Sequence, residues 1–191
     1  MTRNAYRPPF FPLVATAIAI AILGLWFSRE PGPPPDQDEP AAERTDYFLE
    51  RFATTTYRED GTLEGTLYGS QAHHYPERGD LEVDTPLMEW TSETGDLWLS
   101  WSPAGVAREN DGTLLLLEDV VIQRPATATR PQLVIETRDL LVHTRSGTAT
   151  SDAPSKAYEP RGWATSVGLT VHFEDDRLEL HKNARGRYEA P

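Results

Sequence analysis

Apolar and polar side chains alternate along most of the chain after residue 46, and Gly, Asp, Asn or Pro interrupts the alternation at intervals. In the last segment the apolar residues share one parity: Leu178, Leu180, Ala184 and Tyr188. The residues between them are mostly charged or polar. A period of two is the signature of a β-strand with one face buried, so the sequence predicts an all-β fold.

Turn-forming residues recur along this region. Gly79, Gly112, Gly147 and Arg177 each precede or open an alternating segment, at spacings of 33, 35 and 30 positions, and Asp60-Gly61 stands before the first of them. Each interval has room for two strands and two turns, with a further turn at Asp175-Asp176. The spacing therefore predicts a stack of antiparallel hairpins that bury their apolar faces against one another.

Two irregularities sharpen this prediction. Apolar residues change parity between Thr137 and Leu140, which predicts a β-bulge near Asp139. The segment from Leu114 to Ile122 is apolar on both parities except at Glu118 and Asp119, which is typical of a central strand covered on both faces.

The run from Phe10 to Phe27 contains no charged residue. As a helix its 18 residues would extend about 27 Å, close to the hydrocarbon thickness of a bilayer. Basic residues precede the run and acidic residues follow it, so we expect a cytoplasmic N-terminus and an exported C-terminal domain. A cleaved signal peptide is the alternative, although no small-residue cleavage site follows the run. The expected anchor positions are Leu13, Ile18, Ile22 and Leu25.

Composition divides the chain into four parts. We expect a short cytoplasmic N-terminus over 1–9, the membrane anchor over 10–27, a Pro-rich acidic linker over 28–46 and one β-domain over 47–191. The chain has no cysteine, so strand pairing and burial alone must stabilise the exported domain. A formal net charge of −12 without a basic cluster argues against a nucleic-acid partner.

Several segments, in this order and spacing, resemble one known family. They are the N-terminal anchor, Asp60-Gly61 followed by Gly69 to Tyr75, Leu81 to Pro86, Leu114 to Ile122, and the ending from Leu178 to Glu189. In these features the chain resembles LptC, the single-pass inner-membrane component of lipopolysaccharide export. The resemblance implies a twisted, open β-jellyroll of the LptA/LptC type that needs no cofactor.

The resemblance also implies a function and partners. An LptC-like domain receives lipopolysaccharide from an inner-membrane ABC transporter and passes it to the periplasmic bridge protein LptA, while its anchor lies against the transporter. This chain departs from the family at two repeats that often carry a Gly-Asn-Val-like turn. Here those positions read Glu118-Asp119-Val120 and Lys182-Asn183-Ala184.

An open sandwich with an aliphatic inner parity can shelter acyl chains from water. The candidate lipid-contacting residues are Leu63, Leu67, Val83, Leu116, Ile135, Leu169, Val171, Leu178, Leu180 and Tyr188. The same residues would equally form the filled core of an ordinary β-sandwich.

The first and last strands of an unclosed sheet leave backbone groups that another chain can pair with. The candidate edge positions are Phe52, Thr54 and Thr56 on the first strand and Ala184, Gly186 and Tyr188 on the last. Arg185 and Arg187 lie on the outer parity, where protection against aggregation is the favoured interpretation over contact with lipid phosphate.

Catalytic motifs are absent from the sequence, which has no Gly-rich phosphate loop, no Gly-x-Ser-x-Gly and no cysteine nucleophile. His73 and His74 are adjacent, and adjacent strand residues point to opposite faces, so they predict no shared metal site. The sequence therefore favours a lipid-binding protein that is not an enzyme. A membrane-tethered interaction scaffold and an exported hydrolase are the alternatives.

Overall fold

The computed structural model describes residues 44–108 and 110–189, so the expected anchor positions Leu13, Ile18, Ile22 and Leu25 lie outside the described residues. Within these ranges the chain forms eleven strands, and no helix there could cross a bilayer. The strands are β1 (Tyr47–Tyr57), β2 (Leu63–Tyr75), β3 (Asp80–Asp84), β4 (Leu87–Thr91), β5 (Leu97–Trp101), β6 (Ala104–Arg108), β7 (Thr113–Arg124), β8 (Leu133–His143), β9 (Thr148–Glu159), β10 (Gly162–His172) and β11 (Arg177–Tyr188).

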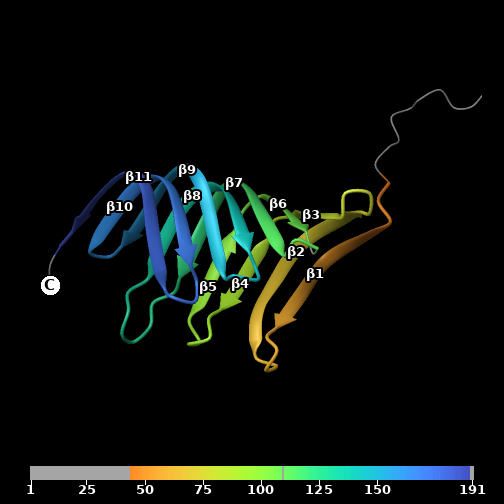
Figure 1. The fold of residues 1–191 in the computed structure, drawn as a ribbon, viewed down its shortest axis with the longest axis horizontal. Helices are drawn as coiled ribbons and strands as arrows, with labels where there is room; N and C mark the ends of the chain where they lie inside the picture. The colour runs from red at the N-terminus through yellow and green to blue at the C-terminus, as the bar shows by residue number, and fades with distance from the viewer. Residues whose placement is uncertain (1–43, 109, 190–191) are drawn as a thin grey trace, which may run out of the picture. The chain divides into compact units, whose positions relative to one another are not determined.

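All strand pairings are antiparallel, and the hairpin order predicted by the sequence is confirmed from β7 to β11. β11 pairs only with β10, and β1 pairs only with β2, so these two strands form the opposite ends of the sheet (Figure 1). β7 lies in the middle and pairs with β8 on one side and with β5 and β6 on the other. The prediction of a central strand over Leu114 to Ile122 is therefore correct.

The sheet folds over into two layers because two strands change partners along their length. β2 pairs with β4 through Gly65–Tyr68 and with β3 through Gln71–Tyr75. β7 likewise pairs with β6 in its first half and with β5 in its second half. β3 and β6 thus belong to one layer, and β4 and β5 belong to the other.

A row of left-handed residues marks the bends inside the long strands. Glu118 in β7, Asp139 in β8, Gly168 in β10 and Asn183 in β11 all have positive φ angles, between 48° and 83°. The register shifts beside each of them, and the backbone N–H of Glu118 donates to Oδ1 of Asp139 at 2.9 Å. The bulge predicted near Asp139 is confirmed. The segments that depart from the family pattern, around Glu118 and Asn183, are bends within strands rather than turns between them.

The predicted turns are present where strands begin. Gly61, Gly79, Gly112 and Gly147 have positive φ and precede β2, β3, β7 and β9, while the turn at Asp175-Asp176 precedes β11. The interval from Gly79 to Gly112 differs from the others because it contains four short strands instead of two. Pro86 and Pro103 interrupt the ladder there, at the two connections that cross between layers.

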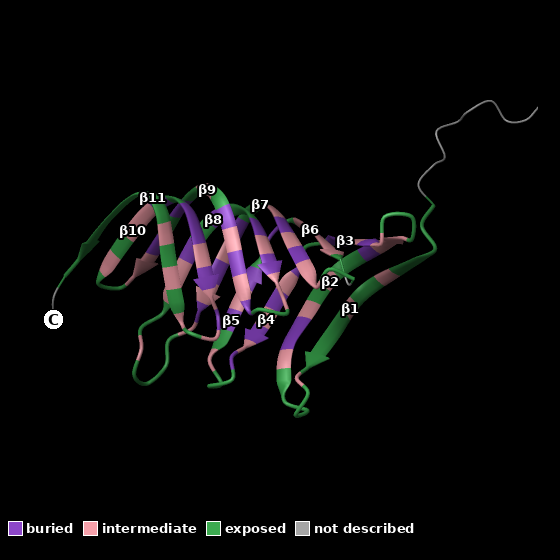
Figure 2. Cartoon of the chain, in the orientation of Figure 1, coloured by how far each residue is buried: buried purple, intermediate pink, exposed green. Residues whose placement is uncertain are grey.

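The space between the layers is filled in the middle of the molecule. Fifteen buried apolar residues form one cluster, including Leu116, Ile122, Ile135, Leu169 and Val171, each with 0% of its surface exposed. Burial alternates along β7 to β10, whereas β1 and β11 are mostly exposed (Figure 2). The outward residues of β7, such as Leu115 and Val121, are half-buried, so its second face is less covered than the sequence predicts.

Truncation of the central strand tests whether this interior is solid. Leu116→Ala should lower the free energy of unfolding by about 2–5 kcal/mol, because it leaves a cavity in a filled core. Leu97→Ala, at a position with 39% exposure, should change it by about 0.5 kcal/mol or less. Urea unfolding of residues 43–191, followed by tryptophan fluorescence, measures both. Equal effects would mean that the core around Leu116 is loosely packed.

Candidate functional site

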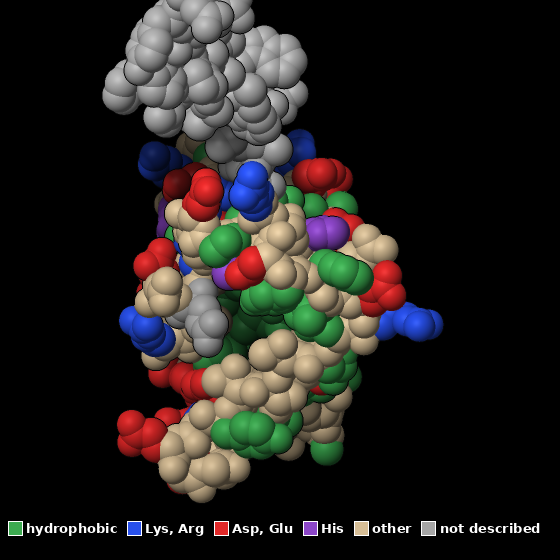
Figure 3. All heavy atoms as spheres, turned by 90° about the vertical axis from the view of Figure 1, so that its right-hand side faces the viewer, with side chains coloured by type: hydrophobic (Ala, Val, Ile, Leu, Met, Phe, Trp, Pro, Cys, Tyr) green, Lys and Arg blue, Asp and Glu red, His purple; other side chains and the backbone are tan. Residues whose placement is uncertain are grey.

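An apolar hollow with charged residues among its lining lies at the β1 end of the sandwich. It has a volume of about 480 Å³ and is lined by residues from β1, β2, β3, β4, β6 and β7 and from the β8–β9 turn. The end-on view shows this recess with hydrophobic side chains on its walls (Figure 3). We call it the β1-end cavity.

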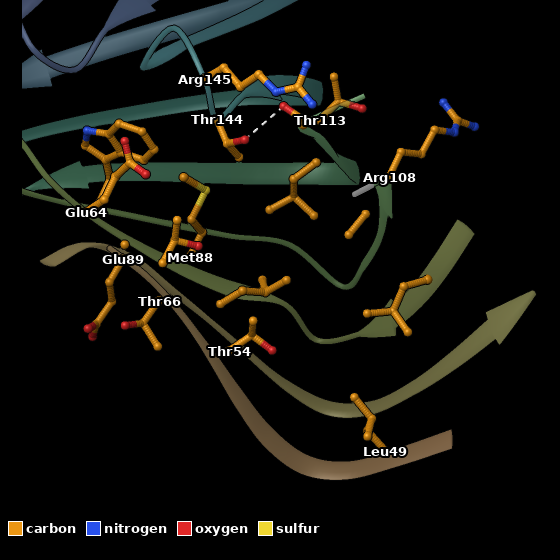
Figure 4. Close-up of a pocket in the computed structure, with 18 of the residues that line it drawn as sticks. Leu49, Thr54, Glu64, Thr66, Met88, Glu89, Arg108, Thr113, Thr144 and Arg145 are labelled. Atoms are coloured by element: carbon orange, nitrogen blue, oxygen red, sulfur yellow. Dashed lines mark hydrogen bonds between the residues drawn. The ribbon is translucent and has the colours of Figure 1, made fainter. Parts of the chain in front are cut away.

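The floor of the β1-end cavity is aliphatic and aromatic. Met88 (Figure 4), Trp90 and Leu114 are buried members of the core cluster, with Leu67 and Ala107 packed against it. Small residues leave the space above this floor unfilled. They are Gly65, Gly79 and Gly112, together with Thr54, Thr56, Thr66 and Thr113. The filled core of the sandwich therefore opens into a hollow where the side chains are too small to fill the space between the layers.

Charged side chains surround the mouth of the cavity. Nε of Arg108 donates to Oδ1 of Asp80 at 2.7 Å, and this bond raises the pKa of the Arg108 guanidinium above its ordinary value. Arg145, Glu64 and Glu89 are the other charged residues of the lining. A hollow with an apolar floor and a charged mouth suits an amphiphile better than a fully polar ligand.

Glu174, in the β10–β11 turn, connects one wall of the cavity to the β10–β11 end of the sheet. Its Oε1 accepts a hydrogen bond from Nε1 of Trp90 at 3.2 Å and pairs with Nη2 of Arg58 at 3.1 Å. Its Oε2 accepts from the backbone N–H of Glu93 at 2.7 Å. One carboxylate in the β10–β11 turn thus holds the β1–β2 and β4–β5 turns together, which restrains the wall that Trp90 forms.

A second ion-pair network joins the neighbouring turns. Nη2 of Arg130 donates to Oδ1 of Asp96 at 2.5 Å, and Arg130 also pairs with Asp176. Asp176 in turn accepts from Nη1 of Arg124, at 2.5 Å. The hydrogen bond from Arg130 is the main reason that the pKa of Asp96 is lowered from its ordinary value of 3.8. These pairs close the core on this side between the β4–β5, β7–β8 and β10–β11 loops.

A second hollow lies at the β11 end, with a volume of about 500 Å³. It is lined by Leu133, Trp163, Leu178, Gly186 and Tyr188 among others, and it lies next to the Arg124–Asp176 pair. The sandwich is therefore solid in the middle and hollow at both of its ends.

The ten predicted lipid-contacting residues fall into distinct environments. Leu67 lines the β1-end cavity, and Leu178 and Tyr188 line the hollow at the β11 end. Leu180 is half-buried against the core, and Leu63 is 43% exposed at the start of β2. The remaining five are core residues with 1% exposure or less: Val83, Leu116, Ile135, Leu169 and Val171.

The predicted edge residues lie on the two terminal strands. Thr54 and Thr56 of β1 line the β1-end cavity, and Phe52 packs so closely over Gly69 that a methyl group there would lie 2.5 Å from its ring. Gly186 and Tyr188 line the other hollow, and Ala184 is exposed on β11. Edges and hollows thus coincide at both ends of the sheet.

Several residues of the β1-end cavity could not be recognised from the sequence, chiefly Leu49, Leu81, Met88, Leu114, Arg108 and Arg145. Leu114 and Met88 have the same alternating pattern as the core residues, so parity alone cannot separate them. One sequence feature could have indicated the cavity. Gly and Thr are concentrated at the start of β2, which pairs with β4, the strand that carries Met88.

An antiparallel sheet folded into two layers, with unpaired edges and hollow ends, defines an open β-jellyroll. The chain belongs to the LptC-related family of lipopolysaccharide assembly, whose model matches residues 13–189. Membership gives the chain a part in lipopolysaccharide transport. No curated protein matches the chain.

The fold is also similar to a solved structure. This is LptH from Pseudomonas aeruginosa, described as the LptA-homologous periplasmic component of the conserved lipopolysaccharide transport device. The TM-score is 0.54 at 4% identity, over 66% of this chain and 95% of LptH. At this identity the similarity supports the jellyroll fold alone.

The Asp96–Arg130 pair makes stability depend on acid pH. Because the pKa of Asp96 is lowered in the folded state, its stabilisation is complete above 3.8 and is lost as the pH falls through the lowered value. Asp96→Asn should therefore cost about 1 kcal/mol or less at pH 7 and progressively less below pH 3.8. Asp175→Asn, at an exposed carboxylate, is the control and should have no effect at either pH. Urea unfolding across the pH series measures both, and a pH-independent Asp96→Asn effect would contradict the assignment.

Proposed function

We propose that this chain is a single-pass inner-membrane protein of lipopolysaccharide export. Its periplasmic jellyroll receives lipopolysaccharide from an inner-membrane ABC transporter, shelters acyl chains in the β1-end cavity and passes the lipid to the bridge protein LptA. The observation that carries this proposal is an apolar cavity of about 480 Å³, open at the end of a jellyroll in a chain of the LptC-related family. The function requires no cofactor and no covalent chemistry.

The hydrophobic effect supplies the reason for such a shelter. Each methylene group exposed to water costs about 0.8 kcal/mol, so an amphiphile with several acyl chains cannot cross an aqueous compartment unprotected. The floor of Leu67, Met88 and Leu114 offers apolar contact, and the open mouth leaves sugars and phosphates in water. Binding and release then depend only on the balance of apolar contact.

The terminal strands support a relay between jellyroll domains. β1 and β11 each have one paired and one open side among the described residues, and both are largely exposed. Backbone groups on an open side can pair with a strand of another domain. Because each hollow lies beside one of these edges, a domain added there would extend the apolar surface available to the lipid.

Site-specific photo-crosslinking tests the cavity. A photo-crosslinking amino acid at Leu67, which lines the cavity, should form lipopolysaccharide adducts in cells. The same residue at Tyr68 is a matched control, because adjacent strand residues face opposite sides and Tyr68 is 37% exposed. Adducts are detected as lipid-dependent mobility shifts on immunoblots.

Outcomes of this experiment separate the two leading functions. Lipid adducts at Leu67 and none at Tyr68 support the shelter. Protein adducts alone at both positions favour a membrane-tethered scaffold that uses its strand edges, an alternative consistent with the filled core of the sandwich.

The proposed anchor is tested by deletion. Removing Phe10 to Phe27, behind a cleavable export signal, should release the domain from the membrane and from a co-purifying ABC complex. The ATPase rate of that complex should change when the anchor is absent. An equally charge-free replacement span of leucine and alanine is the control, since it restores attachment without the native contacts. Retention of the deleted chain in the complex with an unchanged ATPase rate would rule out this role for the anchor.

A further inference from the structure

The mouth of the β1-end cavity is electrically asymmetric. Arg108 and Arg145 lie on the side formed by the end of β6 and the β8–β9 turn (Figure 4). Glu89 of β4 turns its carboxylate to the outer face instead, where it accepts a hydrogen bond from the hydroxyl of Tyr68 at 3.3 Å. An anionic group entering the cavity therefore meets attraction on the arginine side. Acidic residues outnumber basic ones in this chain, so two arginines on one side of an apolar cavity give an anionic ligand a preferred orientation.

Arg145 is held at the mouth without neutralisation. Its Nη2 donates to the backbone carbonyl of Asn110 at 2.9 Å, and its side chain lies over the β6–β7 turn, where a methyl group at Gly112 would be 2.9 Å from Nε. No carboxylate among the described residues forms an ion pair with Arg145. Most of its five N–H donors thus point to solvent or to a ligand.

The turn that carries Arg145 is itself anchored. Both the backbone N–H and the hydroxyl of Thr144 donate to the carbonyl of Gly112 at 2.9 Å. Phe173 N–H donates to the carbonyl of Gly147 at the other side of the same turn, also at 2.9 Å. The guanidinium is therefore positioned on a fixed turn, which lowers the entropy lost when it binds a ligand.

Arg108 has a different role at the same side of the mouth. Its charge is largely compensated, because Asp80 accepts its hydrogen bond and Asp111 lies close enough to raise its pKa further. Arg108 can add hydrogen-bond donors to a ligand but little net attraction. Arg145 is then the main source of positive potential at the cavity mouth.

From this arrangement we infer that Arg145, assisted by Arg108, binds a phosphate group of a lipid whose acyl chain lies on the floor formed by Leu67, Met88 and Leu114. A guanidinium matches phosphate with two parallel N–H···O bonds, which an ammonium cannot reproduce. The inference rests on the proposed function, because it assumes that the cavity holds acyl chains.

The test uses the full-length chain in a neutral detergent, with the photo-crosslinking residue at Leu67 as reporter. Lipid A with its phosphates and the same lipid A after enzymatic dephosphorylation are titrated separately. The wild-type protein should bind the phosphorylated lipid about tenfold more tightly, the size expected for one charge-assisted contact. Arg145→Gln should abolish this preference and leave binding of the dephosphorylated lipid unchanged. Arg145→Lys should retain part of it.

Controls and competing ions make the result specific. Arg138→Gln removes another exposed arginine, outside the cavity lining, and should leave the preference intact. Inorganic phosphate should displace the lipid only at far higher concentrations. Displacement by inorganic phosphate at the concentration of the lipid itself would overturn the inference in favour of a free anion.

The two ideas fail in different ways. If the protein with an unchanged Arg145 crosslinks neither lipid at Leu67, the proposed function is wrong, and so is the phosphate contact that depends on it. If both lipids bind equally well with and without Arg145→Gln, the cavity still binds acyl chains and only the phosphate contact is contradicted.

Discussion

Backbone pairing in one continuous antiparallel sheet is the interaction on which the rest of this structure depends. There is no disulfide to hold the domain, and the core becomes enclosed only because the sheet bends back on itself. Left-handed residues at Glu118, Asp139 and Asn183 provide these bends within individual strands. Their side chains are short or polar and exposed, so a positive φ is tolerated without burying an unpaired polar group.

The bend line also explains why ligand space lies at the ends. Between the layers, β7 to β10 carry aliphatic residues on both sides of the bend, and these meet and fill the interior. Near β1 and β2 several of the lining residues are Gly and Thr, so the layers enclose volume that no side chain occupies. An open sheet thus gains its stability in the middle and its binding capacity beside its edges, where a neighbouring domain can also pair.

Local patterns predicted the strands and turns well, as β7 to β11 illustrate. Gly112, Gly147 and Asp175-Asp176 are short-range signals, and the change of parity near Asp139 carried enough information to predict a bulge. The four short strands between Gly79 and Gly112 could not be predicted in the same way. Pro86 and Pro103 divide this interval into four short strands, because the chain crosses between layers there and pairs with distant partners.

By itself the sequence determined the all-β class, the antiparallel hairpin order from β7 to β11, the bulge and the family, because each depends on residues close together in the chain or on their order. Only the tertiary structure decided that Val83 and Ile135 are core, that Leu67 lines a cavity and that Arg145 lies at its mouth, bonded to the carbonyl of Asn110. The inward-facing aliphatic residues of the core and of the cavity show the same alternation along their strands. A core residue and a cavity-lining residue differ in the strand segment that lies opposite them in the other layer. Long-range strand pairing determines that segment.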